Sequence, residues 1–209
     1  IRTKTGAQVG IGDKIDKVQG IFNPLFNYKK SDNSEKDFDH QFYDGEVIKL
    51  GNLDVRVIHT PGHTPACVTY CIGDAAFVGD TLFMPDYGTA RADFPGGDAL
   101  TLYQSIQRIL ELPAETRLFM CHDYKPATRD RYVWETTVKA QRDSNVHVHQ
   151  GVSADEFVQM RQGRDATLRS PKLILPSIQF NLRAGRLPEP ESNNRRYLKI
   201  PLTVDDETE

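Results

Sequence analysis

The stretch His59–Phe83, HTPGHTPACVTYCIGDAAFVGDTLF, contains two polar turns, and each follows a run of residues typical of a β-strand. His63 lies in the turn Thr60–Pro65, where two prolines and a glycine restrict the backbone and so aim the imidazole. Asp80 follows the apolar run Ala75–Gly79. Proteins often build metal sites from imidazole and carboxylate groups held on rigid elements. The stretch therefore predicts a sheet that carries part of a metal site at one edge.

A third metal-capable side chain, His122, follows the apolar run Arg117–Cys121. Each of the three has an ordinary alternative role: a turn histidine for His63, a capping carboxylate for Asp80 and a solvated surface residue for His122. Their shared position at strand ends favours the metal site. The chain has one H-x-H segment, His147–His149, but Asp-His does not follow it and it comes after the other motifs. We interpret it as a helix-to-loop segment and not as a source of ligands.

The rest of the pattern favours a layered α/β or α+β domain with a sheet core, because strands come first and helices lie between and after them. Alternation predicts strand pairs on either side of turns at Gly51-Asn52 and Gly73-Asp74. Helix signals predict three helices: one that begins after Asp98 and ends before Pro113, one over 128–145, and one opened by a capping box of Ser153 and Glu156.

The ends of the chain and residues 18–45 have weaker patterns. Residues 1–15 resemble the end of a helix, stopped at Gly6, followed by a short strand. Residues 18–45 lack periodicity, and we expect a surface loop with one helical turn that acts as a lid. The tail from Lys172 contains several prolines, and we expect it to be partly extended and to pack across the body.

The composition is that of an ordinary cytoplasmic domain. The 209 residues include 38% hydrophobic and 26% charged residues with a net charge of −3, so the basic surface of a nucleic-acid binder is not expected. No run is long enough to cross a membrane. The three cysteines, Cys67, Cys71 and Cys121, form no C-x-x-C pair, which favours a reducing compartment and buried thiols.

Three segments, HTPGHTPACVTY (59–70), FVGDTLF (77–83) and LFMCHDY (118–124), resemble the later motifs of the metallo-β-lactamase superfamily. Within it, the chain is most similar to the persulfide dioxygenase branch, a neighbour of glyoxalase II. The resemblance implies an α/β fold, a four-layer αββα sandwich with the metal site at one edge of its two sheets. It also implies a single domain over 1–209, with 172–209 as a C-terminal extension that packs on the body.

The first motif of that superfamily, His-x-His-x-Asp-His, is not found in the chain. In the family it lies upstream of the segment that Ile1 matches, so we expect the chain to be the C-terminal part of a longer domain whose first strands precede it. We also expect these residues, expressed alone, to bind metal poorly and to be inactive and unstable, since affinity depends on the complete ligand set.

The resemblance implies an iron enzyme that oxidises glutathione persulfide to sulfite and glutathione. His63 and Asp80 would be two of the three protein ligands of Fe(II), with an upstream histidine as the third, and His122 would act beside the iron as a catalytic hydrogen-bonding residue. One alternative is a zinc-dependent thioester hydrolase like glyoxalase II, in which His122 binds a second metal and Asp80 bridges the two. A non-catalytic binding module with the same fold is another.

Two further residues are candidates for binding the glutathione-like thiol or persulfide. Arg91 matches the arginine that the family uses for a glutathione carboxylate, a group that suits a guanidinium, and a surface salt bridge is the alternative. Tyr124 follows the His122 motif, and a half-buried aromatic at a strand end is its alternative. The family pattern Gly-Arg-Thr-Asp-Phe becomes Ala-Arg-Ala-Asp-Phe at residues 90–94, which leaves the identity of the thiol open. The resemblance also suggests a homodimer.

Overall fold

The computed structural model describes residues 2–28 and 37–202, and its centre is a six-stranded sheet. The strand order is β3-β4-β5-β6-β7-β8. The strands are β3 (Val47–Leu50), β4 (Leu53–His59), β5 (Val68–Ile72), β6 (Ala75–Phe77), β7 (Arg117–Phe119) and β8 (Glu135–Thr137). All neighbours are antiparallel except β6 and β7, which are parallel. The predicted α/β architecture is confirmed.

Two tight hairpins build the first half of this sheet, as predicted. Leu50 pairs with Leu53 and Ile72 pairs with Ala75, so each turn contains only two residues. Gly51 and Gly73 have φ values of +60° and +59°, which an L side chain adopts only at a cost. The parallel pair β6 and β7 needs a crossover, and the helix α3 (Ala99–Leu110) provides it.

The main core lies between this sheet and the helices α3, α4 (Val138–Ser144) and α5 (Ala154–Asp165). On α3, the fully buried Leu102, Ile106 and Ile109 follow helical spacing and pack with Leu118 of β7 and Phe157 of α5. Both predicted caps are present: Asp98 accepts a hydrogen bond from the Thr101 backbone N–H at 2.7 Å, and Ser153 with Glu156 forms the capping box.

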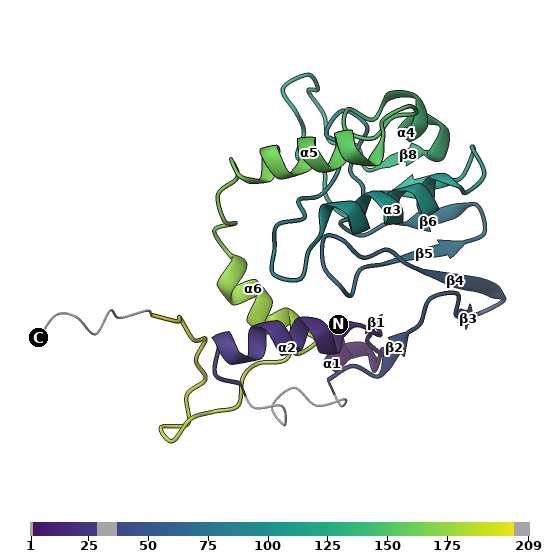
Figure 1. The fold of residues 1–209 in the computed structure, drawn as a ribbon. Helices are drawn as coiled ribbons and strands as arrows, with labels where there is room; N and C mark the ends of the chain where they lie inside the picture. The colour runs from purple at the N-terminus through teal and green to yellow at the C-terminus, as the bar shows by residue number, and fades with distance from the viewer. Residues whose placement is uncertain (1, 29–36, 203–209) are drawn as a thin grey trace, which may run out of the picture.

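A smaller unit lies on the other side of the larger sheet (Figure 1). Here β1 (Gly10–Gly12) pairs in parallel with β2 (His40–Phe42), and α1 (Arg2–Thr5), α2 (Ile15–Leu25) and α6 (Ile174–Asn181) gather around them. Gly6 follows α1 with φ +70°, so the predicted helix end and strand are confirmed.

Among the described residues, no helix combines the length and the apolar character that crossing a membrane requires.

Two predictions of local structure were wrong, and one helix of the tail was not predicted. Residues 18–25 belong to α2 and not to a loop, because Ile15, Val18 and Phe22 share one helical face. In the sequence, Asn23 and Pro24 obscure this pattern. Residues 29–36 of the expected loop lie outside the described residues. The tail contains the helix α6, where Pro176 occupies the first turn and removes no intrahelical hydrogen bond.

The second error concerns the helix expected over 128–145. Residues 135–137 form β8, which pairs with β7, and the helix begins only at Val138. Thr137 ends the strand and caps the helix, since its hydroxyl accepts a hydrogen bond from the Ala140 backbone N–H at 3.1 Å.

Candidate metal centre

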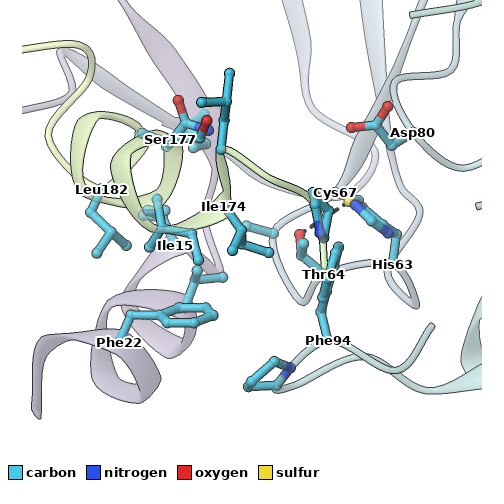
Figure 2. Close-up of a pocket in the computed structure, with 18 of the residues that line it drawn as sticks. Ile15, Phe22, His63, Thr64, Cys67, Asp80, Phe94, Ile174, Ser177 and Leu182 are labelled. Carbon is cyan, nitrogen blue, oxygen red and sulfur yellow. Dashed lines mark hydrogen bonds between the residues drawn. The ribbon is translucent and has the colours of Figure 1, made fainter. Parts of the chain in front are cut away.

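The directions of the strands explain why three distant residues meet. Because β5 is antiparallel to both β4 and β6, and β7 is parallel to β6, the strands β4, β6 and β7 all point the same way. His63 follows β4, Asp80 follows β6 and His122 follows β7, so all three lie at one edge of the sheet. They line two adjoining cavities of about 610 and 280 Å³. Figure 2 shows His63 and Asp80 beside each other at one end of the larger cavity.

Asp80 and His122 form the tightest part of the site. Asp80 Oδ1 lies 3.1 Å from His122 Nε2, and one ligand atom from each of Asp80, Cys121 and His122 lies within 4.8 Å of the other two. Asp80 Oδ1 is buried and accepts no hydrogen bond from the described residues. A buried carboxylate oxygen without a donor is costly, and a bound cation removes that cost. The donor set therefore fits a divalent metal ion.

His63 lies outside this close group of three but presents a nitrogen suited to a metal. Its Nδ1 lies 2.8 Å from the carbonyl oxygen of Arg91. Because a carbonyl only accepts, Nδ1 carries the hydrogen, and in the neutral ring Nε2 is the nitrogen with the lone pair. The Phe94 ring packs edge-on against the imidazole, with 5.3 Å between ring centroids. An imidazole oriented by a hydrogen bond from its second nitrogen is the usual arrangement of a metal-binding histidine.

The turn that carries His63 is clamped to the start of α3. Gly62 has φ +131°, and a Cβ atom at this position would overlap the backbone of Leu102. The Gly62 carbonyl accepts a hydrogen bond from the Asp98 backbone N–H at 2.9 Å, and the Pro61 carbonyl accepts one from the Ser105 hydroxyl at 2.6 Å. Glycine is thus required here for both conformation and space.

A charged cluster that the sequence did not reveal fixes the loop after His122. The Asp123 carboxylate is only 6% exposed; it accepts bonds from both Nη atoms of Arg129, at 2.8 and 2.6 Å, and from the Val133 backbone N–H at 2.7 Å. Arg129 also contacts Asp86 at 2.5 Å. The hydrogen bonds from Arg129 hold the pKa of Asp123 well below its usual value. The position of Asp123 directly after His122 was the only signal of this role.

Both predicted substrate-binding residues line the smaller cavity. The exposed Tyr124 stacks on Tyr87 with 4.8 Å between ring centroids. Arg91 binds Asp93 through Nε at 2.5 Å and Nη2 at 2.6 Å, and its Nη1 donates to the Arg169 carbonyl at 2.9 Å. A local salt bridge therefore occupies much of the Arg91 guanidinium.

Two residues of α5, Arg161 and Arg164, reach the same cavity, and the sequence analysis missed both. Arg161 is buried and paired with Asp165, whereas Arg164 is exposed and has no acidic partner among the residues that the structure describes. Their positions three apart on one helix are the only local signal, and nothing in the sequence shows that α5 lies beside the site.

The larger cavity is mainly apolar. Its walls include Ile15 and Phe22 of α2, Ile174 of α6, and Leu182, which directly follows α6 (Figure 2). Cys67 lies at the end near His63, where burial raises the pKa of its thiol. The prediction of three buried cysteines was wrong for Cys121, which is exposed because it follows β7 at the open edge of the sheet; Cys67 and Cys71 are half-buried.

Known proteins resemble the chain in sequence and in structure. A probable metallo-hydrolase of Burkholderia pseudomallei is 53% identical over 97% of this chain and 72% of its own length. Glyoxylase B2 of Dictyostelium discoideum is 51% identical over 94% of this chain and 68% of its own. The mitochondrial persulfide dioxygenase ETHE1 of Homo sapiens is 34% identical over 68% of this chain and 52% of its own length.

The crystal structure of ETHE1 from Myxococcus xanthus has a TM-score of 0.64 and 33% identity, and the match covers 71% of this chain and 62% of that one. The model of the metallo-beta-lactamase superfamily matches residues 7–122, which include His63, Asp80 and His122. With the relatives above and the shared fold, this match shows that the chain belongs to the metallo-beta-lactamase superfamily.

Proposed function

We propose that this chain is part of an iron-dependent persulfide dioxygenase that oxidises glutathione persulfide. The observation that carries the proposal is the buried Asp80 oxygen without a hydrogen-bond donor, at the strand edge where His63 presents an unprotonated Nε2. One carboxylate and one imidazole are two members of the facial triad that holds Fe(II) and leaves positions open for dioxygen and substrate. The identity to a persulfide dioxygenase supports this assignment.

In this proposal His63 and Asp80 would hold the iron, which supplies the redox chemistry and the binding of dioxygen. Dioxygen and water react with the persulfide, the sulfur–sulfur bond breaks, and the products are sulfite, glutathione and protons. His122 stays off the metal and lies beside it, with its Nε2 3.1 Å from Asp80 Oδ1 but without a hydrogen bond to that oxygen.

The smaller cavity offers cationic groups for the carboxylates of the glutathione moiety. Arg164 is exposed and lacks an acidic partner among the described residues, and Arg91 retains two of the five N–H donors of a guanidinium. Tyr124 lines the same cavity, and partial burial of its side chain, with the charge of Asp80, raises the pKa of its hydroxyl, which therefore stays protonated and able to donate. The apolar walls of the larger cavity limit the access of water.

A zinc-dependent thioester hydrolase is the second candidate. The relatives at 53% and 51% identity, a probable metallo-hydrolase and a glyoxylase, favour it. The short distance between Asp80 and His122 also suits a second metal that shares the Asp80 carboxylate. In that case His122 and Asp80 would both be metal ligands, and the two ions would activate water against the thioester.

One pair of assays separates these candidates. We expect the protein, produced as its gene encodes it, to consume dioxygen with glutathione persulfide and to release sulfite. We expect hydrolysis of S-lactoylglutathione by the same preparation to be slower by about two orders of magnitude, because one bound metal lacks the two-ion arrangement that activates water against a thioester. Rapid thioester hydrolysis without oxygen uptake would establish the hydrolase. Absence of both reactions in metal-loaded protein would favour a binding module.

A further inference from the structure

A buried ion pair within α5 lies behind the candidate site. Arg161 Nη2 contacts Asp165 Oδ1 at 2.6 Å and Arg161 Nε contacts the same oxygen at 3.0 Å, while the two side chains are only 1% and 4% exposed. Burying two charges is costly, and hydrophobic residues of similar size often stabilise a fold as well. Stabilisation of α5 therefore does not by itself explain why this ion pair is present. The hydrogen bonds that the pair makes to residues outside α5 indicate its role.

Those outward contacts all go to the segment 89–92. Asp165 Oδ2 accepts a hydrogen bond from the Ala92 backbone N–H at 2.9 Å. Arg161 Nη1 donates to the carbonyl and to the hydroxyl of Thr89, both at 3.3 Å. The pair thus binds both ends of this four-residue segment, Thr89 at one end and Ala92 at the other.

His147 holds the same segment from a second direction. Its Nδ1 accepts a hydrogen bond from the Thr89 backbone N–H at 3.0 Å, which requires an unprotonated nitrogen. Burial, with the charges of Arg161 and Arg164, lowers the pKa of His147 to about 4, so the ring is neutral at physiological pH. Gly88 allows this approach, because a Cβ atom there would overlap the His147 ring.

Between the two anchored ends lies Arg91, whose carbonyl accepts the hydrogen bond from His63 Nδ1 at 2.8 Å. The position of this carbonyl selects the tautomer of His63 and sets the direction of Nε2. We propose that Arg161 and Asp165 are positioning residues, which orient His63 for metal binding through the backbone of residues 89–92. This inference rests on the proposed function only in taking His63 as a metal ligand.

The variant Asp165→Asn tests the proposal in the protein as its gene encodes it. It removes the charge that holds Arg161 and weakens the acceptor for the Ala92 N–H. We expect the affinity for Co²⁺, measured by competition with a chelator, to fall by 10- to 100-fold, a typical effect of losing an outer hydrogen-bond partner of a ligand. The Co²⁺ absorption bands should shift as well. Asp143→Asn is the matched control, because it breaks an exposed i,i+4 pair with Lys139 on α4.

A second variant covers the case in which Asp165→Asn does not fold. Arg161→Lys keeps a buried cation beside Asp165 but loses the fork that reaches Thr89, and we expect the same direction of change. The His63 tautomer, read from imidazole ¹⁵N shifts without metal, provides a separate measurement. It should be Nδ1–H in the wild type and mixed in both variants.

The outcomes are distinguishable. Wild-type Co²⁺ affinity and an unchanged His63 tautomer in folded variants would overturn the proposal and leave the pair a purely structural role. A wild type that binds no metal would refute the proposed function, and the tautomer measurement would still decide the positioning role. Tight binding with no oxygen uptake would refute the dioxygenase alone.

Discussion

Single residues at the candidate site depend on backbone conformations that glycine alone adopts at low cost. Gly62 is the clearest example, because its φ of +131° and its contact with α3 together determine where the next residue, His63, points. The requirement comes from packing against Leu102, which lies forty residues away in the sequence.

The substitution Gly62→Ala should destabilise the fold by about 3 kcal/mol, since a strained backbone and an overlap with Leu102 act together. Gly51→Ala is the control, because Gly51 also has a positive φ, +60°, but a Cβ atom there would meet nothing within 4 Å. It should cost about 1 kcal/mol. Urea unfolding measures both, and equal losses would show that contact with α3 is unimportant.

At the scale of single residues, the sequence was enough to predict the three candidate metal-site residues but few of the residues that contact them. His63, Asp80 and His122 could be found because each follows a strand-like run within a motif. The roles of Asp123, Arg161 and Asp165 could not be found, because they depend on contacts between distant segments: Arg129 with Asp86, Arg161 with Thr89 and Asp165 with Ala92. Arg91 shows the same limit: its salt bridge to Asp93 is local, but its bond to the Arg169 carbonyl is not.

At the scale of elements, the sequence predicts a strand or helix correctly where the turn or cap that bounds the element is formed by neighbouring residues. The hairpin turns at Gly51 and Gly73 and the caps at Asp98 and Ser153 are local devices, and all four are present. By contrast, residues 135–137 form the strand β8 because their backbone pairs with the edge of β7. The helices α2 and α6 contain Pro24 and Pro176, which suggest loops in the sequence.

The contact between the segment after α4 and the loop at Thr89 should respond to acid. His147 has a pKa of about 4 in the folded protein against about 6.5 unfolded, so the unfolded state takes up the proton first as the pH falls. The free energy of unfolding should therefore decrease from about pH 6.5 down to about pH 4. In His147→Gln this part of the decrease should be absent, as urea titrations at several pH values would reveal.

His149→Gln is the control for that experiment, because His149 is exposed and its ring bonds only to the neighbouring Gln150 carbonyl among the described residues. Its pH profile should match that of the wild type. If His147→Gln shows the same slope as the wild type between pH 6.5 and 5, the ring does not hold Thr89 in its neutral form.

At the scale of the whole molecule, the site lies where the two parts of the fold meet. The larger sheet supplies His63, Asp80 and His122 from one edge, while α2 and α6 of the smaller unit provide the apolar wall (Figure 2). The α/β class could be predicted from the order of elements, but this junction could not, because it joins segments such as Ile15 and Ile174 that are far apart in the sequence.

The central claim is that the site holds one iron ion through His63 and Asp80, with His122 beside it. Elemental analysis of the protein and of His122→Ala tests this most directly. We predict about one iron per chain in both, because in the proposed function His122 lies beside the metal without binding it. Two zinc ions per chain in the wild type, reduced to one in His122→Ala, would contradict the claim and make His122 a ligand of a dinuclear hydrolase.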